Sequence, residues 1–303
     1  MKTDPSIHGI SLSCIARDDN FLFSADDNGK IAKWDANNLS LLKSIEITGA
    51  LFHSIYCDAD YLYVGSSYLD NRIRVFEKCN LDLVETIEAH TSSVTSITGL
   101  DDILISSSAD AVIKKWRKGS WDCLETYQSD QNILLCVSIS ANHRLIFAGG
   151  IGAKIEVISL DELNLNTELK GTNASIFSLV NYENRLYSGS GEIWWGGPGS
   201  PRPPEFESAI RVWDTVTWDC LQILEGHTDN INGLAISDNW LVSASDDGSL
   251  RIYDTESNKQ LICLDIDKIA IKGILSDSEN VYIALRTGSI WKIPLDVIHD
   301  LLG

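Results

Sequence analysis

Three histidines of this chain share one spacing to a serine 16 residues later and to an acid or amide 20 residues later. The sets are His8, Ser24 and Asn28; His90, Ser106 and Asp110; and His227, Ser243 and Asp247. Histidine, serine and a carboxylate are the residue types of nucleophilic catalysis. They also form a chain of side-chain hydrogen bonds, in which the ring nitrogens of the imidazole contact the hydroxyl and the carboxylate.

An aromatic residue extends each set 26 residues after the histidine: Trp34, Trp116 and Tyr253. An indole N–H can donate to the network and complete it. A fully satisfied network of this kind fixes the register of the strands that carry it. We therefore interpret the twelve residues as structural tetrads rather than catalytic sets. The amide oxygen of Asn28 can still accept a hydrogen bond where the other sets carry Asp.

The stretch from Glu225 to Asp254 shows which elements must position one tetrad. INGLAIS, WLVSAS and SLRIYD read as three short strands joined by tight polar turns, which predicts an antiparallel unit. One such unit cannot bury both of its faces, so it needs copies of itself to pack against. WDCLE at 121–125 and WDCLQ at 218–222 are independent signs of such copies.

With Trp34-Asp35 and Trp213-Asp214 added to the tetrads, the chain resembles the WD-repeat family. The resemblance implies an all-β fold, a seven-bladed β-propeller of four-stranded antiparallel blades, with about 40–45 residues per repeat. We expect a single domain over residues 1–303. The expected repeats are 8–47, 48–89, 90–130, 131–170, 171–226, 227–266 and 267–303. The polar signature is lost in the fourth and seventh.

Composition restricts the partners. The net charge of −19 repels nucleic acid phosphates and anionic membranes, and it favours a basic partner or high solubility. Seven scattered cysteines without a C-x-x-C motif suit reduced thiols in a cytoplasmic protein. The N-terminus lacks an apolar export segment, and no run reaches the roughly 20 apolar residues of a membrane span. We expect a cytoplasmic protein.

Enzyme signatures are missing from the sequence. There is no G-x-S-x-G, H-E-x-x-H or phosphate-binding loop. The acidic turn at 26–29 lacks the other ligand positions of a calcium loop, and His53, His143 and His299 have no regular spacing to other ligands. We therefore predict no enzyme activity, no metal and no cofactor. The alternative, a small-ligand or enzymatic propeller that uses the central channel, would need ionisable groups that converge there.

The resemblance implies that partners bind the upper face, which the turns before each first strand and after each second strand form. By alignment the face includes Asn230, Asn232 and Asp246 in repeat six, and His53 and Phe177 in repeats two and five. The aligned positions in the other repeats also include Ser11, Ser13 and Asp27 in repeat one, Ser93, Thr95 and Ala109 in repeat three, and Leu51 and Ser175 in repeats two and five. Lys272 is the only basic residue at these positions. We predict a non-enzymatic protein-interaction scaffold that binds a protein or peptide here.

An insertion interrupts repeat five. Ser188 and Trp213 lie 25 residues apart instead of 10, and the extra residues fall within 191–208. This proline-rich stretch carries Trp194, Trp195, Arg202 and Phe206, and aromatic and Arg side chains are enriched at binding hot spots. Long loops on a rigid scaffold are often functional. The 191–207 loop is thus either a specificity element for the partner or a plug over the channel, and both readings can hold together.

The two ends of the chain must close the ring. A segment near Lys2–Ile7 could supply the outer strand of the last blade, although Pro5 cannot donate to a ladder. The tail Val297–Leu302 could supply that strand instead. We predict that both ends lie at blade seven.

Overall fold

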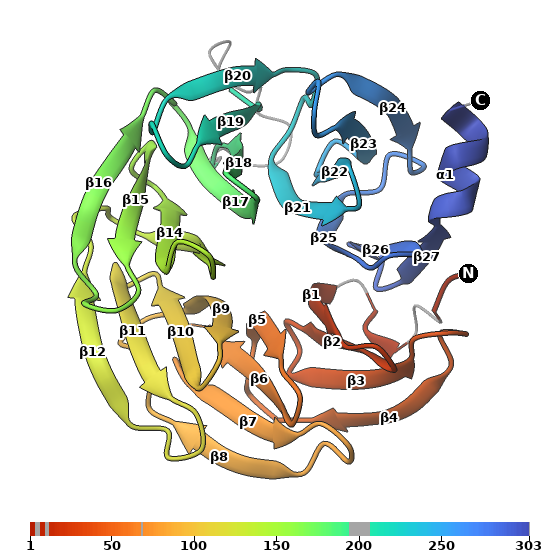
Figure 1. The fold of residues 1–303 in the computed structure, drawn as a ribbon. Helices are drawn as coiled ribbons and strands as arrows, with labels where there is room; N and C mark the ends of the chain where they lie inside the picture. Colours follow the sequence, from red (N-terminus) through yellow and green to blue (C-terminus); the bar gives the residue numbers. More distant parts are fainter. Residues whose placement is uncertain (4–6, 10–11, 68, 194–206, 303) are drawn as a thin grey trace.

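The computed structural model describes residues 1–3, 7–9, 12–67, 69–193 and 207–302. In these ranges the chain forms seven antiparallel sheets that stand as blades around a central axis (Figure 1). Each sheet follows the order of the sequence, with its first strand at the axis and its last strand at the rim. The predicted all-β propeller of seven four-stranded blades is confirmed.

The strands of the first six blades all fall within the corresponding expected repeats. Blades one to three consist of β1 (Leu12–Arg17), β2 (Phe21–Asp26), β3 (Lys30–Asp35), β4 (Leu41–Glu46), β5 (Phe52–Cys57), β6 (Tyr61–Ser66), β7 (Ile73–Glu77), β8 (Leu83–Ile87), β9 (Val94–Leu100), β10 (Ile103–Ser108), β11 (Val112–Arg117) and β12 (Cys123–Gln128). Blades four to six consist of β13 (Leu134–Ser140), β14 (Leu145–Gly150), β15 (Lys154–Ser159), β16 (Leu165–Lys170), β17 (Ser175–Tyr182), β18 (Arg185–Gly191), β19 (Ile210–Asp214), β20 (Cys220–Leu224), β21 (Ile231–Ser237), β22 (Trp240–Ser245), β23 (Ser249–Asp254) and β24 (Gln260–Asp265).

The hydrophobic core lies between neighbouring blades rather than inside any one of them. Leu22 and Trp34 of blade one, for example, pack with Tyr282 and Ala284 of blade seven. Six further clusters repeat this arrangement around the ring. Second strands such as β14 are buried along their whole length, whereas rim strands such as β4 are mostly exposed. A single blade would therefore leave its apolar faces in water.

Blade seven is closed by the N-terminus. Its strands are β25 (Ile271–Ser276), β26 (Asn280–Leu285) and β27 (Ile290–Pro294). Lys2 forms an antiparallel bridge with Trp291, and Thr3 exchanges two hydrogen bonds with Ile290. Residues 1–3 thus take the outer-strand position, so the N-terminal part of the closure prediction is confirmed.

The C-terminal tail also lies at blade seven, but the prediction of a possible tail strand is wrong. It forms the helix α1 (Leu295–Leu302), which begins directly after β27 and lies between blades six and seven (Figure 1). Leu295 and Ile298 are buried in the core that these blades share, and His299 packs on the ring of Trp240. An edge ladder would have left these apolar side chains exposed. No helix in the described ranges is long and apolar enough to cross a membrane.

Candidate functional site at the channel mouth

The tetrads of blades three and six form inside the blades. His90 Nε2 lies 2.8 Å from Ser106 Oγ and His90 Nδ1 lies 3.2 Å from Asp110 Oδ2, while Trp116 Nε1 donates to the same serine at 2.9 Å. In blade six the two contacts of His227 measure 2.7 Å to Ser243 and 2.9 Å to Asp247. The serine hydroxyls are fully buried. A substrate cannot reach them, which supports a structural role.

Blade one forms the same network with a different acid. His8 Nε2 contacts Ser24 Oγ and Trp34 Nε1 donates to it, both at 2.7 Å. The carboxylate at His8 Nδ1 belongs to Asp26, also at 2.7 Å, so the assignment of Asn28 to this position is wrong. Asp26 replaces both the Asp and the turn-capping Ser of the other blades, because its second oxygen accepts from the N–H groups of Asn28 and Lys30.

The aromatic end of the blade-six tetrad also differs from the prediction. The Tyr253 hydroxyl is buried and makes no hydrogen bond within the described residues. Ser243 Oγ instead lies 3.4 Å from the carbonyl of Arg251. A phenol places its hydroxyl differently from an indole N–H, so the substitution keeps the packing and loses the bond. Blade five retains that bond, since Trp213 Nε1 donates to Ser188 Oγ at 2.9 Å.

A β-bulge recurs in the first strand of every blade, always at the residue that directly follows a buried apolar residue near the start of that strand. In blade one the pairing steps from Leu12 to Cys14, and Ser13 is left out of the register. Equivalent shifts occur in the other six blades. A bulge re-aims the extra side chain. We call the seven extra residues the bulge ring: Ser13, His53, Thr95, Leu135, Phe177, Asn232 and Lys272.

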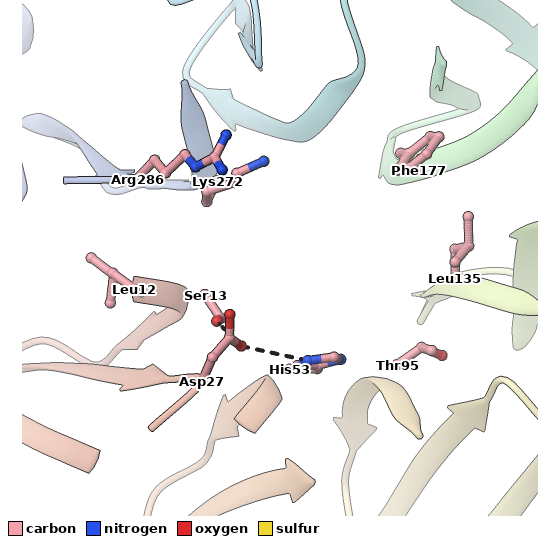
Figure 2. Close-up of a pocket in the computed structure, with 9 residues that line it drawn as sticks. All are labelled: Leu12, Ser13, Asp27, His53, Thr95, Leu135, Phe177, Lys272 and Arg286. Carbon is pink, nitrogen blue, oxygen red and sulfur yellow. Dashed lines mark hydrogen bonds and ion pairs between the residues drawn. The ribbon is translucent and has the colours of Figure 1, made fainter. Parts of the chain in front are cut away.

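Six of the seven bulge-ring residues line one cavity of about 660 Å³ at the axis, on the upper face. We call this cavity the channel mouth. Its complete lining is Leu12, Ser13, Asp27, His53, Thr95, Leu135, Phe177, Lys272 and Arg286. Figure 2 shows Lys272 and Arg286 together on one side, Asp27 beside His53 on a second, and Leu135 with Phe177 on a third. The mouth is therefore polar and charged at one arc and apolar at the other.

The residues that directly follow the second strands form the other half of the site. Asp27 follows β2, and it accepts from Ser13 Oγ at 2.6 Å and lies 3.5 Å from His53 Nε2. Asp246 follows β22 in the same way, and it accepts from Asn232 Nδ2 at 2.8 Å and from Lys272 Nζ at 2.5 Å. Each aspartate thus contacts the bulge-ring residue of its own blade and that of the next blade.

Ser13, Asp27 and His53 are the residue types of a hydrolytic triad, but their order differs from one. The hydroxyl of Ser13 donates to Asp27, and the imidazole of His53 lies on the other side of that carboxylate. A triad requires the imidazole between the hydroxyl and the carboxylate, because the imidazole takes the proton of the nucleophile. This arrangement supports a polar contact surface rather than acyl transfer.

The predicted partner-binding residues fall into four groups. His53 and Phe177 line the channel mouth, while Asn232 and Asp246 form the network beside it. Asn230 has a different position, because its side-chain oxygen accepts from the N–H of Glu192 at 2.8 Å and holds the start of the insertion. Trp194, Trp195, Arg202 and Phe206 lie outside the described residues.

Both ends of the insertion are anchored on the upper face. Gly191 still pairs with Ser175 at the end of β18, and Glu207 forms an ion pair with the buried Arg211 of β19. The insertion thus joins the second and third strands of blade five, at the same place as the turn of Asp27 in blade one. It leaves the blade on the side of the channel mouth, next to Phe177 in β17.

Sequence reasoning missed two lining residues that matter for the chemistry. Leu135 occupies the bulge of blade four, and Arg286 follows β26 as Asp27 follows β2. Lys272 is therefore not the only basic residue at the mouth. The pairing of Ile271 with Leu285 fixes this equivalence, and repeat seven lacks the polar signature that would have revealed it in the sequence.

A carboxylate cluster lies apart from the mouth, between blades three and four, with Glu156 buried, Glu168 partly buried and Asp130 exposed. Oxygens of Asp130, Glu156 and Glu168 lie within 4.8 Å of one another. Lys154 Nζ already forms ion pairs with Asp130 and Glu168, and Ser129 Oγ donates to Glu156 at 2.9 Å. Burial, together with the neighbouring Asp130, raises the pKa of Glu156. The cluster thus forms a salt-bridge network around Lys154 that reaches the surface at Asp130.

Comparison with known proteins agrees with this architecture. Residues 81–117 and 218–254 match the family described as "WD domain, G-beta repeat". The first segment runs from the last strand of blade two into blade three and contains the blade-three tetrad. The second runs from the last strand of blade five into blade six and contains the blade-six tetrad. The protein is a seven-bladed propeller in which two segments match WD repeats. The expectation drawn from the tetrads is thereby confirmed.

Similar proteins match this chain over part of their own length. Nuclear distribution protein PAC1 of Candida glabrata is 20% identical over 82% of this chain and 65% of its own. WD repeat-containing protein pop2 of Schizosaccharomyces pombe is 29% identical, over 64% of this chain and 24% of its own. Myosin heavy chain kinase C of Dictyostelium discoideum is 23% identical, over 69% of this chain and 19% of its own. The propeller spans less than two thirds of each of these relatives.

Proposed function

We propose that the protein is a non-enzymatic interaction scaffold that binds a protein or peptide at the channel mouth. The observation that carries the proposal is the bulge ring. Each of the seven blades has a β-bulge in its first strand, and six of the seven bulge residues line one cavity. Each bulge interrupts the pairing of a first strand with its second strand and re-aims one side chain, and at the mouth six of these side chains share one cavity. WD-repeat proteins typically act as protein-interaction scaffolds.

The 191–207 loop is the proposed specificity element. It is extra to the repeat, and its ends leave blade five beside the apolar arc of the mouth. Proline in a loop reduces the ordering entropy that is lost when a partner docks. The net charge of −19 favours a partner with basic character and opposes nucleic acid and anionic membranes. The free cysteines suit a cytoplasmic location.

Comparative capture from a lysate of the source organism tests the scaffold function. The mouth variant combines Leu135→Ala with Phe177→Ala, which removes the apolar arc. The control is Val216→Ala, which truncates an exposed hydrophobic residue in the turn after β19, on the opposite face. We expect proteins that the parent and the control retain equally and the mouth variant retains at least tenfold less. Equal capture by all three proteins would place the partner site elsewhere.

Replacement of residues 191–208 by the sequence Asp-Asp-Gly of 246–248 tests the loop. The short turn has the length that the same position has in blade six, so we expect a cooperative thermal transition close to that of the parent. Binding of the captured partner should be lost. Loss of folding would show instead that the loop acts as a plug of the channel, and retained binding would remove it from the recognition surface.

A further inference from the structure

We infer that the channel mouth recognises a peptide carboxylate through Arg286, with an apolar side chain of the same peptide seated on Leu135 and Phe177. The inference rests on the proposed function and adds the chemistry of the ligand. It follows from the charge pattern around the mouth, where each charged turn residue is positioned between two members of the bulge ring.

Arg286 is the exception in that pattern. Asp27 accepts from Ser13 of its own blade and lies 3.5 Å from His53 Nε2 of the next blade, while Asp246 accepts from Asn232 of its own blade and Lys272 of the next. For Arg286 those two residues are Lys272 and Ser13, and neither is an acid. The exposed Arg286 guanidinium accordingly makes no hydrogen bond or ion pair with any residue that the structure describes. Its backbone N–H is fixed on the carbonyl of Ala270 at 2.9 Å, so the side chain starts from a rigid position at the cavity.

Lys272 strengthens the attraction for an anion without being free itself. Its ammonium group is paired with Asp246, and it lies beside Arg286 on the same side of the mouth (Figure 2). A guanidinium binds a carboxylate through two parallel hydrogen bonds. Among the residues that the structure describes, Arg286 is therefore the cation at the mouth that has no partner and the shape that suits a carboxylate, in a chain whose overall charge is strongly negative.

The balance of charges favours a carboxylate over a phosphate. Lys272 and Arg286 carry two positive charges, and Asp27 and Asp246 carry two negative charges. A carboxylate adds one negative charge, whereas a phosphate group adds about −1.5 to −2. The phosphate would leave more uncompensated negative charge beside the two aspartates. Phosphorylated peptides thus become an outcome of the test rather than the expected ligand.

The apolar arc supplies the second contact. Leu135 and Phe177 come from adjacent blades, are partly exposed and lie across the mouth from Arg286 (Figure 2). Such a pair offers a seat for an aliphatic or aromatic side chain. A peptide that crosses the mouth would thus place an Asp or Glu at blade seven and an apolar residue at blades four and five.

Selection from a random twelve-residue peptide library displayed on phage, against the intact 303-residue protein, tests the inference. We expect enriched peptides that combine Asp or Glu with an aliphatic or aromatic residue. Synthetic copies should bind Arg286→Ala at least tenfold more weakly, while the control Arg117→Ala, an exposed arginine at the far end of β11, should bind as the parent does. Selection against Arg286→Glu should enrich Lys or Arg in place of the acid.

The variants separate this inference from the proposed function. Peptides that lose binding to the Leu135→Ala/Phe177→Ala variant but bind Arg286→Ala normally would overturn the carboxylate assignment and leave the mouth as the binding site. Peptides indifferent to both variants, or a library without enrichment, would overturn both proposals. A phosphoserine copy that binds Arg286-dependently and at least tenfold more tightly than the carboxylate peptide would replace the carboxylate by a phosphate.

Discussion

The tetrad acids are expected to contribute unequally to stability, and Asp110→Ala should cost more than Asp247→Ala. In blade three, Asp110 is the acceptor that His90 Nδ1 contacts, and its carboxylate also accepts from the N–H groups of Thr91 and Val112. Removal of the acid leaves a buried imidazole N–H without a partner. An unsatisfied buried donor costs about 1–3 kcal/mol, so we expect a loss near the upper end of that range.

Blade six contains a reserve partner. Ser249 Oγ donates to Asp247 at 2.6 Å and lies 3.1 Å from His227 Nδ1. After Asp247→Ala this hydroxyl is free to accept from the imidazole, whereas Val112 at the equivalent position in blade three has no hydroxyl. One retained hydrogen bond is worth about 1 kcal/mol. Asp247→Ala should therefore be about 1 kcal/mol milder than Asp110→Ala, and adding Ser249→Ala should abolish the difference.

Urea denaturation at pH 7, followed by tryptophan fluorescence, measures these losses as shifts of the midpoint at constant slope. Asp219→Ala, an exposed acid in the turn before β20, is the matched control and should stay within about 0.5 kcal/mol of the parent. Equal losses for Asp110→Ala and Asp247→Ala, with no further effect of Ser249→Ala, would refute the reserve-partner argument.

Burial alone would raise the pKa of Asp110, but the bonds from His90 and Thr91 outweigh it and hold the pKa well below its usual range. The contribution of this carboxylate is thus present above about pH 4 and is lost as the pH falls further.

Two other perturbations address the salt-bridge cluster and the closure of the ring. Because burial and Asp130 raise the pKa of Glu156, its protonated form is favoured by folding, and that stability is lost as the pH rises from about 4.3 through the raised value. Glu156→Gln should therefore gain stability relative to the parent between pH 4 and pH 8. Glu168→Gln should lose stability over the same range, because Lys154 holds the acid of Glu168 ionised. Thermal melts of both variants and the parent at pH 4 and pH 8 measure this, and stability changes of the same sign in both variants would contradict the assignment. Deletion of residues 2–6 should lower the thermal midpoint, because Lys2 and Thr3 complete blade seven; an unchanged midpoint would show that α1 alone closes the ring.

The sequence predicted the tetrads well where spacing and geometry coincide. In blades three and six the acid lies in the turn, 20 residues after the histidine, and a serine at the end of the second strand caps that turn. Blade one merges both tasks in Asp26, 18 residues after the histidine, so counting residues selected Asn28 instead. A fixed spacing cannot detect a side chain that reaches the same point from a neighbouring position.

Alignment also located most of the bulge ring, because each member follows a buried apolar residue at the start of a first strand. It missed Arg286 because repeat seven keeps no polar signature. Only the pairing of β25 with β26 shows that Arg286 occupies the position in its blade that Asp27 and Asp246 occupy in theirs. That Arg286 has no partner among the described residues depends on blades six, seven and one together, because Lys272 is paired with Asp246 and the next bulge-ring residue is Ser13. Residue types in one repeat could not reveal that the next bulge-ring residue would be Ser13 rather than an acid.

The scaffold and the recognition surface are separable for a physical reason. Stability comes from the apolar cores between blades and from the tetrads within them, and neither uses the bulge-ring side chains. The backbone of the bulge fixes where each of these side chains begins, whatever its type, and so the ring can carry Ser, His, Thr, Leu, Phe, Asn and Lys on nearly identical blades. Recognition therefore depends on which residue each blade presents in the bulge ring and on which of the charged residues at the mouth pair with one another. That is why Arg286, which has no partner in the described part of the chain while Asp27 and Asp246 have theirs, indicates a ligand more strongly than the same residue would on an open surface.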